Sequence, residues 1–265
     1  MKALSQGRYL GRDGEAALFD LGLGYTLSLR ILEGDIGRVT LKPRDGYRLD
    51  RGWSIAPGGV EPPYEGRPRD SVEGFSCPRT LVKQDEGKVF LTAGHLSAEV
   101  TLSPFGIAWY RVGEDKPFLQ DRTTQAYLVS PRTGALAHFM TRDYSERHYG
   151  LGDKAGPLDR TGRRFAIDAV DPCGFDAELS DPLYKMLPFF IVDGPAGAHG
   201  IYYDNLSTGS VDFGCTLDNY HGLFRSWKGD DGDLDYYVVA GPTVPDVVRR
   251  FSWLTGGQAF APLWS

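Results

Sequence analysis

The sequence predicts a mainly β protein, an antiparallel β-sandwich with a single helix near the C-terminus. Short segments rich in β-branched and aromatic residues recur along the chain, and many alternate apolar and polar residues as half-buried strands do. Turn residues separate these segments, because the 34 Gly and 17 Pro of the 265 residues are spread out rather than bunched. No fixed period repeats along the chain, which argues against a propeller.

The expected strands follow one another along most of the chain. Spacings of roughly 10–20 residues with turn residues between them are typical of antiparallel sandwiches. The segments are 25–32, 36–42, 89–92, 97–103, 107–112, 124–129, 135–141, 189–192, 200–203, 210–214 and 234–240. We therefore assign residues 1–240 to a β-sandwich domain and residues 241–265 to a separate C-terminal part.

A helix is expected directly after the last strand, where the sequence reads GPTVPDVVRRFSWLTGG. Thr243 suits the N-cap and Gly256 suits the C-terminal cap. The apolar residues that a helix would place on one face are Val247, Val248, Phe251 and Leu254. An amphipathic helix with one buried face is the prediction.

Two segments interrupt the strand pattern. Residues 44–76 are polar and rich in Gly and Pro, and a loop of that length is often functional. We interpret it as an ordered surface excursion anchored by Trp53 and Tyr64, and a ligand-contacting loop stays open as the alternative. Residues 229–235 read GDDGDLD, but the Gly and Glu of a calcium loop are not in place, so a solvated hairpin turn is expected.

Composition excludes several classes of protein. The chain has 29 Lys+Arg against 35 Asp+Glu, a net charge of -6 that argues against nucleic-acid binding. No apolar run approaches the roughly 20 residues that span a bilayer, and the first residues lack the shape of a signal peptide. Cys77, Cys173 and Cys215 lie far apart and are expected to be free thiols. These features favour a cytoplasmic protein without a membrane partner.

The residues alone select no catalytic site. There is no GxSxG nucleophile motif, no phosphate loop and no metal-ligand spacing, so neither a metal nor a cofactor is expected. The histidines, interpreted as structural or surface residues, are His95, His138, His148, His199 and His221. A catalytic carboxylate pair could come from any of the many Asp and Glu residues, and no motif identifies one.

The stretch from residue 149 onward resembles a known family. The matching blocks, in order, are YGLGDK (149–154), GRRF (162–165), DPLYK with PFF (181–185 and 188–190), GIYYDN (200–205) and DFG (212–214). The tail, with GPTVPDVV and the final PLW, matches as well. Together these blocks resemble the N-terminal domain of family 31 glycoside hydrolases, the α-glucosidase and α-xylosidase family.

The resemblance implies a galactose-mutarotase-like supersandwich followed by a linker helix. In the family, a catalytic (β/α)8 barrel follows this domain and carries both catalytic carboxylates. This sequence ends where the barrel would begin, and the family's nucleophile motif is not found in it. The resemblance therefore implies an accessory domain of a retaining α-glycosidase, with α-glucosidase the expected activity. The domain would pack on the barrel of the same polypeptide, complete its substrate pocket, and lack catalysis by itself.

One residue is expected to bind the substrate. In the family, a loop of this domain reaches over the barrel mouth and places an acidic residue on the sugar hydroxyls. That residue aligns with Asp171 in the stretch RRFAIDAVDPCGFD. Asp168, Ala169 and Cys173 depart from the family pattern around it. The alternative is that Asp171 caps a turn before Pro172.

Two other functions stay open. A free-standing carbohydrate-binding module would use aromatic platforms, for which the candidates are Trp53, Tyr64, Trp109 and Trp227. A mutarotase-type epimerase would need a His and a Glu in one groove, for which the candidates are His138, His148 and Glu146. The exposed helix and Trp264 would also favour self-association of the chain.

Overall fold

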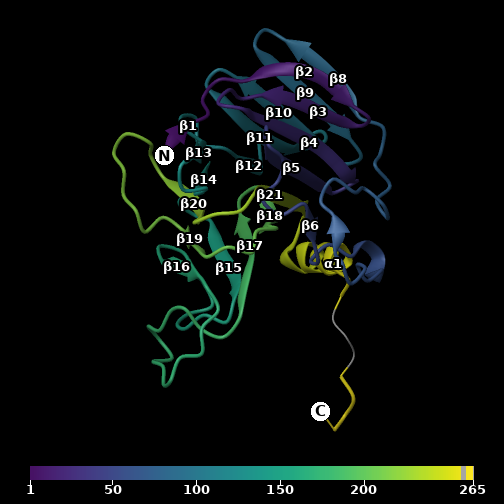
Figure 1. Cartoon of the computed structure of the whole chain (residues 1–265). Helices are drawn as coiled ribbons and strands as arrows, with labels where there is room; N and C mark the ends of the chain where they lie inside the picture. The colour runs from purple at the N-terminus through teal and green to yellow at the C-terminus, as the bar shows by residue number, and fades with distance from the viewer. Residues whose placement is uncertain (258–260, 265) are drawn as a thin grey trace.

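Antiparallel sheets form nearly all of the regular structure in the computed structural model, which describes residues 1–257 and 261–264 (Figure 1). The largest sheet has eight strands in the order β15-β17-β18-β21-β5-β4-β3-β2. Their bounds are β2 Arg8–Asp13, β3 Ala16–Asp20, β4 Tyr25–Glu33, β5 Ile36–Pro43, β15 Arg147–Gly152, β17 Met186–Gly194, β18 Gly197–Tyr203 and β21 Leu234–Ala240. The last strand of the sequence, β21, therefore lies in the middle of this sheet, between β18 and β5.

Two further sheets face the large one. The five-stranded sheet consists of β12 Leu119–Gln120, β11 Phe105–Arg111, β10 Leu96–Leu102, β9 Lys88–Ala93 and β8 Leu81–Asp85. The six-stranded sheet consists of β1 Lys2–Ala3, β13 Tyr127–Val129, β14 Leu136–Thr141, β20 Phe224–Gly229, β19 Gly209–Asp212 and β16 Arg164–Ile167. Buried residues of all three sheets form one hydrophobic core, which confirms the predicted β-sandwich.

The single α-helix among the described residues packs on the other face of the eight-stranded sheet. Helix α1 spans Val244–Thr255, begins at the N-cap Thr243 and ends at Gly256, whose φ of 95° is left-handed, as the sequence predicted. Its Phe251 ring stacks on Phe189 of β17 with ring centroids 3.7 Å apart. Val248 was expected on the buried face, but it is 46% exposed, because the face that meets the sheet is narrower than the apolar pattern suggested.

The excursion over residues 44–76 lies beside α1 and is ordered. It contains β6 Arg51–Gly52 paired with β7 Arg67–Pro68, and the 3-10 helix η1 Pro57–Gly59. The expected anchors are wrong, since Tyr64 is 96% exposed and Trp53 is also exposed. Other residues of the excursion hold it in place: the Ala56 amide donates to the Leu254 carbonyl of α1 at 2.9 Å, and the Arg69 side chain is buried.

The prediction of a hairpin turn at residues 229–235 is wrong. β20 and β21 belong to different sheets, so the segment between them is a crossover from one layer of the sandwich to the other. Its acidic residues are not all solvated, because Asp233 and Asp235 are buried. Within the described residues, no helix has the length and apolarity that crossing a bilayer requires.

Candidate functional site

Asp171 lies on the loop of residues 168–185 that connects β16 to β17. Its side chain is exposed, and its carboxylate accepts no hydrogen bond from any residue that the structure describes. The turn-capping interpretation is therefore wrong for Asp171. Asp176 performs that role further along the loop, where its Oδ1 accepts the amides of Glu178 at 2.8 Å and Leu179 at 2.9 Å.

The two arms of this loop are held together on either side of Asp171. The Val170 amide donates to the Leu183 carbonyl at 3.3 Å, and the Tyr184 hydroxyl donates to the Pro172 carbonyl at 3.4 Å. The backbone around Asp171 is thus fixed, while its carboxylate stays free to accept hydrogen bonds from a ligand. A free carboxylate on a fixed backbone suits the recognition of neighbouring hydroxyl groups.

A buried ion pair lies at the base of the loop. Lys154 Nζ donates to Asp181 Oδ1 at 2.8 Å and to the Ala166 carbonyl at 2.6 Å, and the Lys154 side chain has no exposed surface. Asp181 Oδ2 accepts the Ala166 amide at 2.5 Å. Asp181 therefore connects three chain segments: the start of β17, the end of β16, and the connection that carries Lys154.

Arginine side chains brace the neighbouring turns through backbone carbonyls. Arg160 is buried and donates to the carbonyl oxygens of Lys154, Ala155, Gly156 and Pro157. Arg163 donates to the Ala155 carbonyl at 3.1 Å and to the Glu178 carbonyl at 3.4 Å. Arg164 pairs with Asp212 at 2.9 Å. Arg163 and Arg164 therefore brace the turns and the strand that lead into the loop.

The loop that carries Asp171 also exposes several large apolar side chains. The exposed large side chains on it are Phe175, Leu179, Tyr184 and, at the start of β17, Leu187. Exposed apolar side chains gathered in one segment mark a contact surface more often than a solvated one. The acidic residue and the apolar residues thus share one projecting loop (Figure 1).

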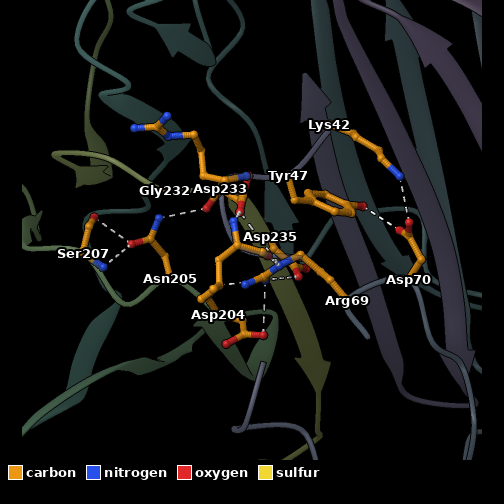
Figure 2. Close-up of polar contacts among 12 residues, drawn as sticks. Lys42, Tyr47, Arg69, Asp70, Asp204, Asn205, Ser207, Gly232, Asp233 and Asp235 are labelled. Atoms are coloured by element: carbon orange, nitrogen blue, oxygen red, sulfur yellow. Dashed lines mark hydrogen bonds and ion pairs between the residues drawn. The ribbon is translucent and has the colours of Figure 1, made fainter. Parts of the chain in front are cut away.

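A second polar site lies inside the molecule, where the excursion meets the eight-stranded sheet (Figure 2). Asp235 of β21 accepts from Arg38 at 2.9 and 2.7 Å and from Arg69 at 2.7 Å. Asp204 also lies 3.4 Å from Arg69, and burial raises the pKa of the Asp204 carboxyl. Because three of these residues come from the sheet and its ends and Arg69 comes from the excursion, the cluster fastens the excursion to the sheet.

The crossover segment supplies the rest of this cluster. Asp233 accepts the amides of Arg48 and Leu49 at 2.9 and 3.0 Å, and burial raises its pKa (Figure 2). Asn205 donates to the Asp231 and Asp233 carbonyls. Asp233 and Asp235 of the GDDGDLD stretch therefore bind the protein's own backbone and arginines.

Both histidines proposed for an epimerase are buried, and Glu146 is partly buried. His148 Nε2 lies 4.0 Å from Glu146 Oε2, so the two side chains do come together, and Glu146 also pairs with Arg225 at 2.6 Å. Burial, together with Arg225, lowers the pKa of His148 to about 2. His138 is elsewhere in the core and bonds Asp121 at 2.7 Å. Buried histidines without access to a groove do not form an acid–base site for a sugar ring.

The aromatic platforms are only partly available. Trp109 and Trp227 are buried in the core, so neither can stack on a ligand. Trp53 and Tyr64 are exposed neighbours on the excursion, where the Trp53 Nε1 donates to the Tyr64 carbonyl at 3.0 Å. Among the described residues, no group of three or more His, Cys, Asp or Glu side chains could hold a metal ion.

The sequence named Asp171 as a candidate but did not predict the residues that hold its loop. Lys154 and Asp181 both stand in blocks that carry the family resemblance, which was the available signal. Their contact spans 27 positions of the chain, however, and spacing alone does not pair two charges so far apart. Arg69 and Asp235 are further apart still.

A three-sheet β-sandwich with a helix on its outer face and a braced acidic loop defines a galactose mutarotase-like domain of the kind found in glycoside hydrolases. Residues 26–212 match the family model described as the glycosyl hydrolase 31 N-terminal galactose mutarotase-like domain. The chain belongs to this family.

Comparisons with individual proteins agree. The chain is 29% identical over 184 residues to α-glucosidase 2 of Bacillus thermoamyloliquefaciens, a match that covers 69% of this chain and 22% of the relative. It is 25% identical over 212 residues to an α-xylosidase of Emericella nidulans, covering 72% of this chain and 26% of that protein. The family 31 dextranase of Flavobacterium johnsoniae has the same fold, with a TM-score of 0.77 at 20% identity over 97% of this chain and 29% of that one. The chain thus spans about a quarter of the length of these relatives.

Proposed function

We propose that this domain serves a retaining α-glycosidase, an α-glucosidase, by completing the substrate pocket of a catalytic barrel in the same polypeptide. Asp171 would accept hydrogen bonds from sugar hydroxyls at the mouth of that pocket. The observation that carries the proposal is the exposed, unpaired Asp171 carboxylate on a loop whose backbone is fixed on both sides. The apolar side chains of the same loop, Phe175 and Leu179 among them, would contact the barrel.

The carboxylates that this chain brings close together are not a hydrolytic pair. Retaining hydrolysis needs two accessible carboxyl groups about 5–5.5 Å apart on either side of the bond. Asp204, Asp233 and Asp235 do gather, but they are buried and bonded to arginines and backbone amides. We therefore propose that cleavage depends on residues outside this chain.

A carbohydrate-binding module is the second candidate. The exposed Trp53 and Tyr64 lie next to each other on the excursion and could stack on a sugar. This candidate requires sugar binding by the chain alone, whereas the accessory-domain proposal requires the barrel.

A cytoplasmic location is part of the proposal. Cys77, Cys173 and Cys215 are free thiols, and the latter two are exposed. Exposed unpaired thiols persist in a reducing compartment and are uncommon in oxidising ones. Labelling of the thiols in intact cells, compared with lysed cells, would test this location.

The decisive experiment compares this chain with the product of its gene read through beyond Ser265. Hydrolysis of p-nitrophenyl α-glucoside and α-xyloside is measured for both proteins. We expect activity only in the longer product, and we expect Asp171→Asn to raise its KM about tenfold, as for a lost charge-assisted hydrogen bond, with little change in kcat. Activity in the 265-residue chain, or an unchanged KM in Asp171→Asn, would overturn the proposal. Sugar binding by the short chain that Trp53→Ala removes would favour the binding module.

A further inference from the structure

We propose that Lys154 is a positioning residue for substrate recognition: it fixes the loop of residues 168–185 so that Asp171 is presented in one place. This inference rests on the proposed function of Asp171 and deepens it. Lys154 itself touches no ligand, because its side chain is fully buried. It would act entirely through Asp181 and the backbone of Ala166.

Lys154 contacts both arms of the loop. Its ammonium group donates to the Ala166 carbonyl at the end of β16, where the loop departs, and to Asp181, where the chain returns toward β17. Asp181 closes the ring by accepting the Ala166 amide. The departing and returning arms are therefore joined at their base by one ammonium group and one carboxylate.

The segment that begins at Asp181 also contacts the backbone on both sides of Asp171. Asp181 is followed by Leu183 and Tyr184, which bond the residues on either side of Asp171. A displacement of Asp181 would therefore move the backbone that carries the Asp171 carboxylate. Small displacements of a substrate-binding group weaken substrate binding strongly, because the strength of a hydrogen bond depends steeply on distance and angle.

The burial of a lysine at position 154 indicates that its charge is needed there. A buried ammonium group loses its hydration and is retained only where its partners are well placed. An apolar residue at position 154 could fill the same space but could not hold the Asp181 carboxylate and the Ala166 carbonyl at once. The pair therefore specifies a loop geometry rather than adding packing alone.

The first test measures the loop in the 265-residue chain. Cys173 lies two positions from Asp171 and is exposed, so a nitroxide can be attached to it after Cys77→Ser and Cys215→Ser. We expect Lys154→Met to increase the mobility of the label at a temperature where the chain remains folded. Lys83→Met, which breaks an exposed Lys–Asp pair on the five-stranded sheet, serves as the matched control and should change nothing. Equal spectra for Lys154→Met and Lys83→Met would overturn the inference.

If Lys154→Met does not fold, Asp181→Asn gives the same information. It keeps the shape and one acceptor oxygen but removes the charge that holds Lys154, and the label should again become more mobile. An unchanged spectrum in Asp181→Asn would also overturn the inference.

The second test uses the longer gene product and separates this inference from the proposed function. We expect Lys154→Met to raise KM with little change in kcat, and the double variant with Asp171→Asn to be no worse than Asp171→Asn alone, because both changes remove the same interaction. If Asp171→Asn raises KM and Lys154→Met does not, the inference fails while the proposed function stands. If Asp171→Asn itself has no effect on KM, the proposed function fails, and the label spectra alone still decide whether Lys154 fixes the loop.

Discussion

Residues of the same type occupy opposite environments in this chain. Asp171 is exposed and unpaired, whereas Asp235 is buried and accepts three hydrogen bonds from two arginines. The residue type alone gives no sign of this difference, although Asp235 stands in the apolar strand β21 and Asp171 stands before a proline in a loop. Whether an aspartate is buried and paired depends on the distant segment that packs beside its side chain. The role of a charged residue is therefore set by tertiary contacts.

The buried histidines predict how stability depends on pH. Burial and Arg225 lower the pKa of His148 to about 2, so the folded chain keeps this imidazole neutral. The unfolded chain, in which its pKa is about 6.5, takes up a proton below that pH. Because the unfolded state then binds more protons, the free energy of unfolding should decrease as the pH falls below about 6.5 and should not depend on this group above that pH.

Urea denaturation at about pH 7.5 and about pH 5.5 measures this effect on either side of the imidazole pKa. We expect His148→Gln to lose less stability than the unaltered chain over this interval. Some dependence should remain, since burial also lowers the pKa of His199. His95→Gln, at an exposed histidine, is the control and should behave as the unaltered chain does. A pH dependence that is the same in His148→Gln would contradict the prediction.

At the scale of elements, the excursion over residues 44–76 is held by charge as well as by packing. Asp235→Asn should leave Arg38 and Arg69 buried without their carboxylate and lower the free energy of unfolding by about 3–5 kcal/mol. Asp85→Asn, in the exposed pair with Lys83, should change it by less than about 0.5 kcal/mol. Both values come from denaturant titrations, and similar small losses in the two variants would show that the cluster does not hold the excursion.

Sequence patterns found strands rich in β-branched and aromatic residues, including β21, which is buried along its whole length. Each expected strand is present, and α1 has the predicted caps. β2 was missed because it is a mostly exposed strand with little apolar content, and β20 because its sequence, FRSWKG, has no β-branched residue. The excursion and the crossover were misjudged because their buried charges find partners far away in the sequence. For the candidate site, the resemblance proposed Asp171, and no sequence pattern pointed to the residues that hold its loop.

At the scale of the whole molecule, the surface beyond α1 predicts self-association of the 265-residue chain. Leu263 and Trp264 are exposed, the latter by 88%, and Val248 adds to the apolar surface on α1. Exposed apolar groups of this size associate when their natural cover is missing. Sedimentation velocity should show an average mass that rises with concentration. The variant with Leu263→Ser and Trp264→Ser should remain a monomer. The control Tyr64→Ser, at a similarly exposed aromatic residue, should associate as the unaltered chain does. An average mass of the unaltered chain that stays constant at all concentrations would refute the prediction.

The place of β21 in the eight-stranded sheet has a consequence for synthesis on the ribosome. β21 is the last strand of the eight-stranded sheet to be made, yet it pairs with β18 on one side and β5 on the other. Until residue 240 has emerged, β5 and β18 each present an unpaired edge, and the two parts of the sheet have no strand to join them. We expect the nascent chain to acquire its tertiary structure late and almost at once, with chaperones shielding those edges while the ribosome completes the final strand.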